Sequence, residues 1–257
     1  MTDSKKVAVI TGATGGIGAA LARRLAARGW ALALNARGAE ALHRLAEELR
    51  RNGTEVLCIP ADVSDPDRAG DLIEQARAWK ERIDALLNVA GLAPMISLAD
   101  TTPAQWRQIL DTNLSATFYT TRAVWPVFLR QHNQCTQTTP GNDPAHRGPA
   151  SGGVIVNISS EASRNPFPGL GAYGAAKAAL NLLTLAAARE GRDSGVRAVC
   201  IAPAAVETSM FRSLPIAPKV SAQAILQPDD VAQAAIAAID GDLWCSSGET
   251  IFIHRRV

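Results

Sequence analysis

Tyr173 and Lys177 are the residues whose types and spacing point most clearly to chemistry. In a helix, residues four positions apart lie on one face, so the lysine ammonium can sit beside the tyrosine phenol. A nearby cation stabilises the phenolate and lowers the pKa of the tyrosine toward neutral pH, which suits it to proton transfer. The alternative interpretation is a chance spacing, with Tyr173 a half-buried core aromatic.

Ser160 stands thirteen residues before Tyr173, at the end of an apolar run from Val154 to Ser159 that predicts a strand. Catalytic groups of open parallel sheets gather outside the carboxyl ends of the strands. Ser160 is therefore a candidate for binding a reacting group. The alternative is a turn residue whose hydroxyl bonds its own backbone.

A glycine-rich turn, TGATGGIG, follows the first predicted strand, Val7 to Ile10, and precedes an amphipathic helix. Glycines at such a place let the backbone turn sharply and approach a pyrophosphate at the helix N-terminus. The spacing departs from G-x-G-x-x-G, so the alternative is an ordinary tight turn, but the place at the start of a βαβ unit favours a nucleotide site. The candidate residues of this turn are Gly12, Thr14, Gly15, Gly16, Ile17 and Gly18.

The end of the second predicted strand, WALALNA, indicates which nucleotide binds. An acidic residue about 20 positions beyond the glycines would bind the ribose hydroxyls of NAD(H). This chain has Asn35, Ala36 and Arg37 there instead. Because the planar fork of an arginine suits a 2′-phosphate, we expect NADP(H), with NAD(H) less favoured. The alternative is that Arg37 is a solvated surface residue.

Predicted strands alternate with helices along the chain, which indicates right-handed βαβ units. We therefore expect an α/β fold: a single-domain, Rossmann-type, doubly wound parallel sheet of about seven strands with helices on both faces, spanning residues 1–257. Either Ser64 or Asp65 should cap the helix that starts at Pro66. Thr102 should cap a long helix that runs from Pro103 to about Arg130.

The segment 131–153 interrupts this alternation, because it is polar, rich in Gly, Pro, Asn and Thr, and longer than an ordinary connection. We interpret it as a mobile surface insert, with a lid or a subunit contact as the alternative. His132, Cys135 and His146 lie in or beside it, but their spacing matches no familiar metal site, so no metal is expected.

The composition is that of an ordinary globular protein, with 47% hydrophobic residues, 19% charged residues and a net charge of +2. That balance gives no indication of nucleic acid or an anionic membrane as a partner. Four widely separated cysteines, a start without a signal-peptide pattern and the lack of any apolar run of about 18 residues together favour a reduced, cytoplasmic protein.

With these residues in order, the chain resembles the classical short-chain dehydrogenase/reductase family. The likeness extends from Val7 to about Thr208 and includes further motifs beyond those above. They are Asp62-Val63 after the third strand, Asn88-Val89-Ala90-Gly91 after the fourth, Asn113 in the long helix, and Pro203 to Thr208 after the sixth.

The resemblance implies a role for each matching position. Tyr173 would be the general acid and base, Lys177 would lower its pKa and hold the nicotinamide ribose, and Ser160 would orient the substrate carbonyl. Asn113 would interrupt helix bonding and hold a water in a proton relay. The remaining cofactor contacts would be Asp62 and Val63 at the adenine, Asn88, Ala90 and Gly91 at the middle of the cofactor, and Pro203, Val206 and Thr208 at the nicotinamide.

The sequence thus predicts an NADP(H)-dependent oxidoreductase that acts on a small-molecule carbonyl or alcohol, as a homodimer or homotetramer. The alternative is a non-catalytic NADP-binding regulator or scaffold on the same fold. The expected pocket wall, within 93–98, 161–170 and 210–226, favours a moderately apolar ketone, hydroxy compound or acyl thioester over a charged sugar. We interpret Arg164 and Arg212 as solvated rim charges. The C-terminus departs from the family's usual Asp-Gly-Gly ending, which makes a tetramer less assured.

Overall fold

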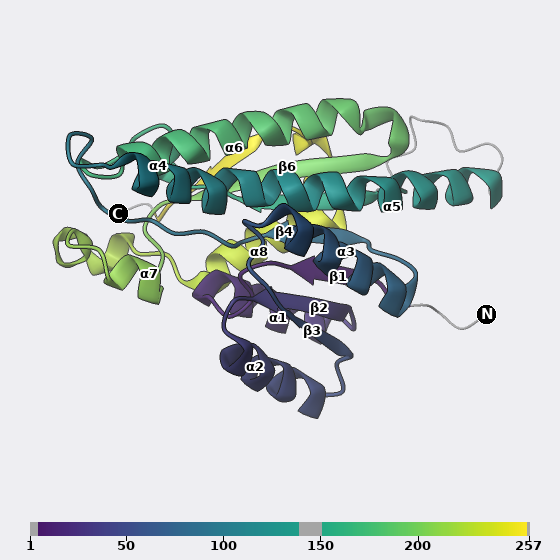
Figure 1. Ribbon diagram of the computed structural model, residues 1–257. Coiled ribbons are helices and arrows are strands. Elements are labelled where there is room, and N and C mark those ends of the chain that lie inside the picture. The colour runs from purple at the N-terminus through teal and green to yellow at the C-terminus, as the bar shows by residue number, and fades with distance from the viewer. Residues whose placement is uncertain (1–4, 139–150, 256–257) are drawn as a thin grey trace.

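The computed structural model describes residues 5–138 and 151–255. In this part of the chain seven strands form one sheet with the order β3-β2-β1-β4-β5-β6-β7, and every neighbouring pair is parallel (Figure 1). The predicted doubly wound α/β fold is therefore confirmed. The strands are β1 Val7–Ile10, β2 Ala31–Ala36, β3 Val56–Pro60, β4 Ala85–Asn88, β5 Gly153–Ile158, β6 Val196–Pro203 and β7 Thr250–Ile253.

Helices cover both faces of the sheet. The apolar side chains of α1, α2 and α8 pack on one face, and those of α3, α5 and α6 pack on the other. The helices are α1 Gly16–Ala27, α2 Ala39–Arg51, α3 Pro66–Lys80, α4 Pro103–Leu110, α5 Ala116–Thr138, α6 Gly171–Glu190, α7 Ser209–Arg212 and α8 Pro228–Asp240. Alternate residues of a strand point to opposite faces, so Ala8 and Ile10 join one core and Val9 the other.

Two of the helices begin where capping chemistry predicts. Asp65, rather than Ser64, caps α3, because its carboxylate accepts hydrogen bonds from the amides of Asp67 and Arg68. Thr102 caps α4 through a reciprocal capping box with Gln105. These caps fix where each helix starts at the carboxyl edge of the sheet.

The predicted long helix is divided by one π-helical turn, η1 Asp111–Ser115, between α4 and α5. The buried Asn113 lies in this turn, and its side-chain amide donates to the carbonyl of Ile109 at 2.9 Å. A side chain therefore takes the place of a backbone donor at this turn, as the resemblance implied.

The predicted end of this helix was wrong, because α5 continues past Arg130 to Thr138. Gln131 explains the extension: its amide donates to the carbonyls of Ile83 and Gly152, and its carbonyl accepts from the amide of Ile83. Residues 131–138 are thus helical, and Gly153 already belongs to β5. Residues 139–150 of the predicted insert, with His146, lie outside the described residues.

Candidate active site

The carboxyl ends of β1 and β4 form the point where the chain switches direction across the sheet, since β2 and β3 lie on one side of β1 and β4 on the other. The hydroxyl of Thr11 accepts from the amides of Val89 and Ala90, at 3.0 and 3.2 Å, and so joins the two strand ends. Ligands of open α/β sheets bind at such a switch point. Thr11 was not among the predicted site residues, although its place directly after β1 was a usable signal.

Gly12 is required beside this switch. Its φ is +61°, and a Cβ there would lie 2.8 Å from the backbone of Ala90. Another residue would therefore be strained in conformation and would also push the β4 end away. Gly12 therefore allows the glycine-rich turn to pack closely against the backbone that follows β4.

The N-terminus of α1 is open to a ligand. Gly15 stands at the N-cap and supplies no side-chain hydrogen bond, and the first turn holds no acidic residue. Amides at the start of a helix that no side chain caps can bind an anion, and the helix dipole favours negative charge there. The predicted pyrophosphate site requires uncapped amides of this kind, and the binding itself stays a prediction.

Tyr173 and Ser160 are brought together by α6 and by the end of β5. Both line one cavity of about 310 Å³ at the carboxyl edge of the sheet. Burial raises the pKa of the Tyr173 phenol, and a hydrogen bond with Ser160 opposes this rise only in part. The expectation that Lys177 lowers this pKa toward neutral pH is therefore wrong for this structure, because burial dominates. The phenol is protonated at neutral pH, in the form that can donate a proton.

Lys177 lies one helical turn after Tyr173 and lines the same cavity. Its side chain is only 4% exposed, its Nζ donates to the carbonyl of Ile158 at 2.7 Å, and it lies 5.8 Å from the centre of the Tyr173 ring. Burial lowers the pKa of Lys177 to about 8, so the ammonium is mostly charged at pH 7. The predicted shared helix face is confirmed.

Asn113 is the fourth predicted catalytic residue in the cavity. Its amide donates to the carbonyl of Leu92 at 2.9 Å, and its Oδ1 accepts from the amide of Leu92 at 3.2 Å. The residue thus holds the segment after β4 against η1. A Cβ on Gly91 would meet Asn113 Oδ1 at 2.8 Å, so the backbone passes very close to this side chain.

Asn88 is placed differently from a ligand-binding side chain. Its amide donates to Asn157 Oδ1 at 2.9 Å, and its Oδ1 accepts from the Thr120 hydroxyl at 2.8 Å. Asn157 in turn donates to the Thr184 hydroxyl at 2.9 Å. This buried chain joins α5, β4, β5 and α6 below the cavity. The polar Asn157 within the apolar run VIVNI was the sequence signal for it.

At the end of β2, the side chain of Asn35 is buried and donates to the carbonyls of Ile59 and Ala61 at 2.9 and 3.1 Å. It therefore ties β2 to the end of β3. Arg37 is exposed nearby. Burial opposes ionisation of the Asp62 carboxyl, but hydrogen bonds from Ser64 and the charge of Arg37 outweigh it and lower its pKa.

The segment after β6 forms the other side of the cavity. Pro203, Val206 and Thr208 line it, together with Ile17 from α1. The Thr208 hydroxyl caps α7 by accepting from the amide of Phe211 at 3.1 Å.

Val63, by contrast, is buried in the core on the α3 side of the sheet. Of the predicted apolar wall, the cavity includes Ala93, Phe167, Phe211 and Leu214, whereas Pro94, Met95, Ile96 and Pro166 do not line it.

The chain is similar to known proteins over nearly its whole length. A family model described as enoyl-(acyl carrier protein) reductase matches residues 12–254. An acetoacetyl-CoA reductase of Allochromatium vinosum is 30% identical over 92% of this chain and 92% of its own length. The chain belongs to the classical short-chain dehydrogenase/reductase family. It is an oxidoreductase of this family, whose members act on small molecules.

Two solved structures share the whole architecture. A 3-ketoacyl-(acyl-carrier-protein) reductase from Brucella melitensis, complexed with NADH, has a TM-score of 0.84 at 26% identity and covers 96% of both chains. A short-chain dehydrogenase from Burkholderia cenocepacia, in complex with NADP, has a TM-score of 0.81 at 26% identity over 96% of both chains. A glycine betaine reductase of Emericella nidulans is 33% identical over 92% of this short-chain dehydrogenase, which spans only 18% of that relative's length.

No helix in the described part of this short-chain dehydrogenase is long and apolar enough to cross a membrane. Likewise, the described residues contain no group of three or more His, Cys, Asp or Glu side chains that could hold a metal ion.

Proposed function

We propose that this short-chain dehydrogenase transfers hydride between NADP(H) and a carbonyl or secondary alcohol. The observation that supports this proposal most strongly is the convergence of Tyr173, Lys177, Ser160 and Asn113 on one cavity at the carboxyl edge of the sheet. The cavity opens beside a helix N-terminus that no side chain caps. A regulator that only bound a nucleotide would have no use for a proton donor such as Tyr173 with Ser160 beside it.

The residues divide the chemistry between them. The bound cofactor supplies or accepts the hydride. The protonated phenol of Tyr173 donates its proton to the carbonyl oxygen in reduction and recovers it in oxidation. Ser160 orients that oxygen, Lys177 stabilises the phenolate, and Asn113 supports a water that returns the proton. Both raised and lowered pKa values at one site are typical of acid and base pairs.

The residues present fit a nicotinamide dinucleotide. Gly12, Gly16 and Gly18 let the turn before α1 fold tightly, since Cβ atoms there would meet neighbouring protein atoms. Gly91 leaves space for a ribose beside Lys177. A Cβ on Gly91 would lie 3.7 Å from Lys177 Nζ and so would fill the space such a ribose needs. The comparison structures carry NADH in one case and NADP in the other, so the preference for NADP(H) is our own proposal, and it rests on Arg37.

The test is NADPH consumption by the purified protein with quinones, ketosteroids, β-ketoacyl thioesters, cyclic ketones and aldehydes, and with NADH in parallel. We expect turnover of at least one class, faster with NADPH. Saturable NADPH binding with silence across the panel would favour the regulator alternative. Silence without NADPH binding would contradict the nucleotide site itself.

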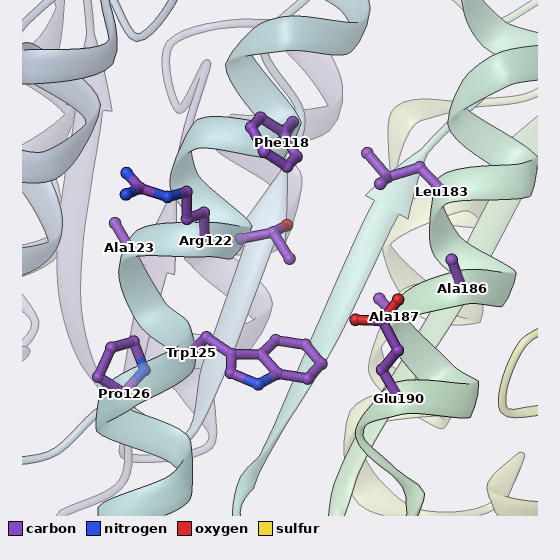
Figure 2. A pocket seen from close by; sticks show the side chains of 10 residues that line it. Phe118, Arg122, Ala123, Trp125, Pro126, Leu183, Ala186, Ala187 and Glu190 are labelled. Carbon is purple, nitrogen blue, oxygen red and sulfur yellow. The ribbon is translucent and has the colours of Figure 1, made fainter.

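We also propose that the protein is a homo-oligomer that pairs through α5 and α6. Figure 2 shows a groove between these helices, in which Phe118 and Trp125 lie opposite Leu183 and Ala186. Phe118, Leu129 and Leu182 are exposed on them. Arg122 and Glu190 also line the groove, and neither has an ion-pair partner within residues 5–138 and 151–255. A two-fold axis would set each of these charges against its opposite in a second copy.

A further inference from the structure

We infer that Glu161 makes the pocket selective for uncharged, apolar carbonyl compounds and excludes substrates with an anionic group near the carbonyl. The inference rests on the proposed hydride transfer and names its substrate class. It starts from the position of Glu161, which directly follows Ser160 and lines the cavity.

The substrate part of the cavity is otherwise apolar. Its side chains come from the segments after β4, β5 and β6 and from α7 onward. They are Leu92, Phe167, Leu170, Met210, Phe211, Leu214, Ile216 and Val220. Of the described residues that line the cavity, Glu161 carries an acidic side chain and Lys177 a basic one. Lys177 is 4% exposed, and its charged Nζ is held beside Tyr173 by donating to the Ile158 carbonyl, so Glu161 is the charged side chain on the substrate wall.

The Glu161 carboxylate is held by an ion pair with Arg164, whose side chain is not part of the cavity lining. Arg164 donates to both carboxylate oxygens of Glu161, at 2.9 and 3.0 Å. The guanidinium carbon of Arg164 in turn lies 3.7 Å from the ring centre of Phe252 in β7. Glu161 lines the cavity, whereas Arg164 does not, because its guanidinium stacks on Phe252. The wall next to Ser160 therefore presents the negative end of this ion pair.

The other arginine beside the cavity, in α7, is also paired with a carboxylate. Arg212, the other arginine considered as an anion ligand, pairs with Glu207, its Nε 2.7 Å from Oε1. The interpretation of Arg164 and Arg212 as solvated rim charges is thus refined, because each donates to a neighbouring carboxylate. Neither is free to bind a carboxylate, sulfonate or phosphate.

An anion bound beside Ser160 would lie within several ångströms of a fixed like charge in an apolar cavity. Like charges at such separations repel strongly near a protein surface, and the Arg164 counter-charge weakens this repulsion, so we expect affinity to fall on the order of tenfold. Specificity of this kind arises from a repulsive element and not from an added contact. An uncharged ketone of equal shape meets no such repulsion and gains from the apolar wall.

A matched pair of substrates tests this inference: methyl 4-acetylbenzoate and 4-acetylbenzoate, which differ in charge at one position. We would measure kcat/KM with NADPH, and the Kd of each compound for the NADP⁺-loaded protein by calorimetry. The wild type should favour the ester at least tenfold by both measures. Glu161→Gln should lower the ratio of ester to acid, in kcat/KM and in affinity, at least tenfold, since it leaves the Arg164 charge unopposed.

Two further variants separate charge from structure. Arg164→Gln should increase the preference for the ester, because it leaves the Glu161 charge unopposed. Nonspecific structural damage would instead change the preference in the same direction in both variants. Glu74→Gln is the matched control, since Glu74 and Arg77 form the same i,i+3 pair on α3, away from the cavity. It should leave the preference unchanged.

The inference is overturned if wild type uses both compounds equally, if neither compound binds, or if Glu161→Gln and Arg164→Gln shift the preference alike. Ester binding with the expected preference but without Tyr173-dependent reduction would instead overturn the proposed function and leave the selectivity in place.

Discussion

At the scale of single residues, the buried charge of Lys177 serves the proposed chemistry and lowers the stability of the folded state. Burial lowers its pKa from 10.5 to about 8, whereas the unfolded chain keeps the ordinary value. The folded state therefore binds this proton more weakly, and the fold is destabilised at every pH below about 8. This penalty disappears as the pH rises from about 8 toward 10.5.

Lys177→Met should accordingly abolish turnover and yet raise the free energy of unfolding at pH 7 by about 1–2 kcal/mol, after allowing for the hydrogen bond to Ile158 that is lost. The gain should shrink between pH 8 and pH 10. Urea unfolding at several pH values measures this. A variant less stable than wild type at pH 7 would show that the buried charge is fully compensated.

Arg37 carries the proposed cofactor preference. Its charge contributes to the lowered pKa of Asp62, which places it at the expected adenosine end of the site. Arg37→Ala should raise the Kd of NADPH about tenfold or more and leave that of NADH nearly unchanged, because only NADPH carries the 2′-phosphate. Fluorescence titration with both nucleotides measures this. Equal losses would remove the assignment.

At the scale of helices and strands, the sequence predicted the alternation, the caps and the position of the site. It did so because apolar periodicity and capping are local properties. The end of α5 was missed, since Gln131 is fixed by Ile83 and Gly152, which are distant in the chain. The structural bonding of Asn35 and Asn88 was missed for the same reason: their partners come from other strands and helices.

Asn88 gives a test at this scale. Asn88→Ala would leave Asn157 Oδ1 without its donor in the core, so the free energy of unfolding should fall by about 1–3 kcal/mol. The Kd of NADPH for the folded protein should change little. Asn133→Ala, an exposed asparagine on α5, is the matched control and should have little effect. Normal stability with weakened NADPH binding would instead support the cofactor contact that the resemblance implied.

At the scale of the whole molecule, the open question is what covers the apolar groove of α5 and α6. If two copies pair there, Arg122 and Glu190 face each other across the interface, and reversing one charge sets like charges together. Arg122→Glu should weaken the dimer at least tenfold, and Arg122→Glu with Glu190→Arg should restore it. Light scattering over a dilution series measures this. A monomeric wild type at micromolar concentration would contradict the proposal.

The cytoplasmic location remains a prediction from the sequence. The architecture itself is secure, because the sheet order and the family relatives agree over nearly the whole chain.

The most direct test of the central claim follows the hydride itself. Wild-type protein and Tyr173→Phe would be incubated with NADPH carrying two deuterium atoms at C4 and a ketone or aldehyde from the panel, and the product analysed by mass spectrometry. We predict one deuterium on the new alcohol carbon with wild type. The variant should be about 10²- to 10⁴-fold slower, because it lacks the proton donor, with an unchanged Kd for NADPH. Deuterium transfer at the wild-type rate by Tyr173→Phe, or alcohol formed without deuterium, would contradict the mechanism.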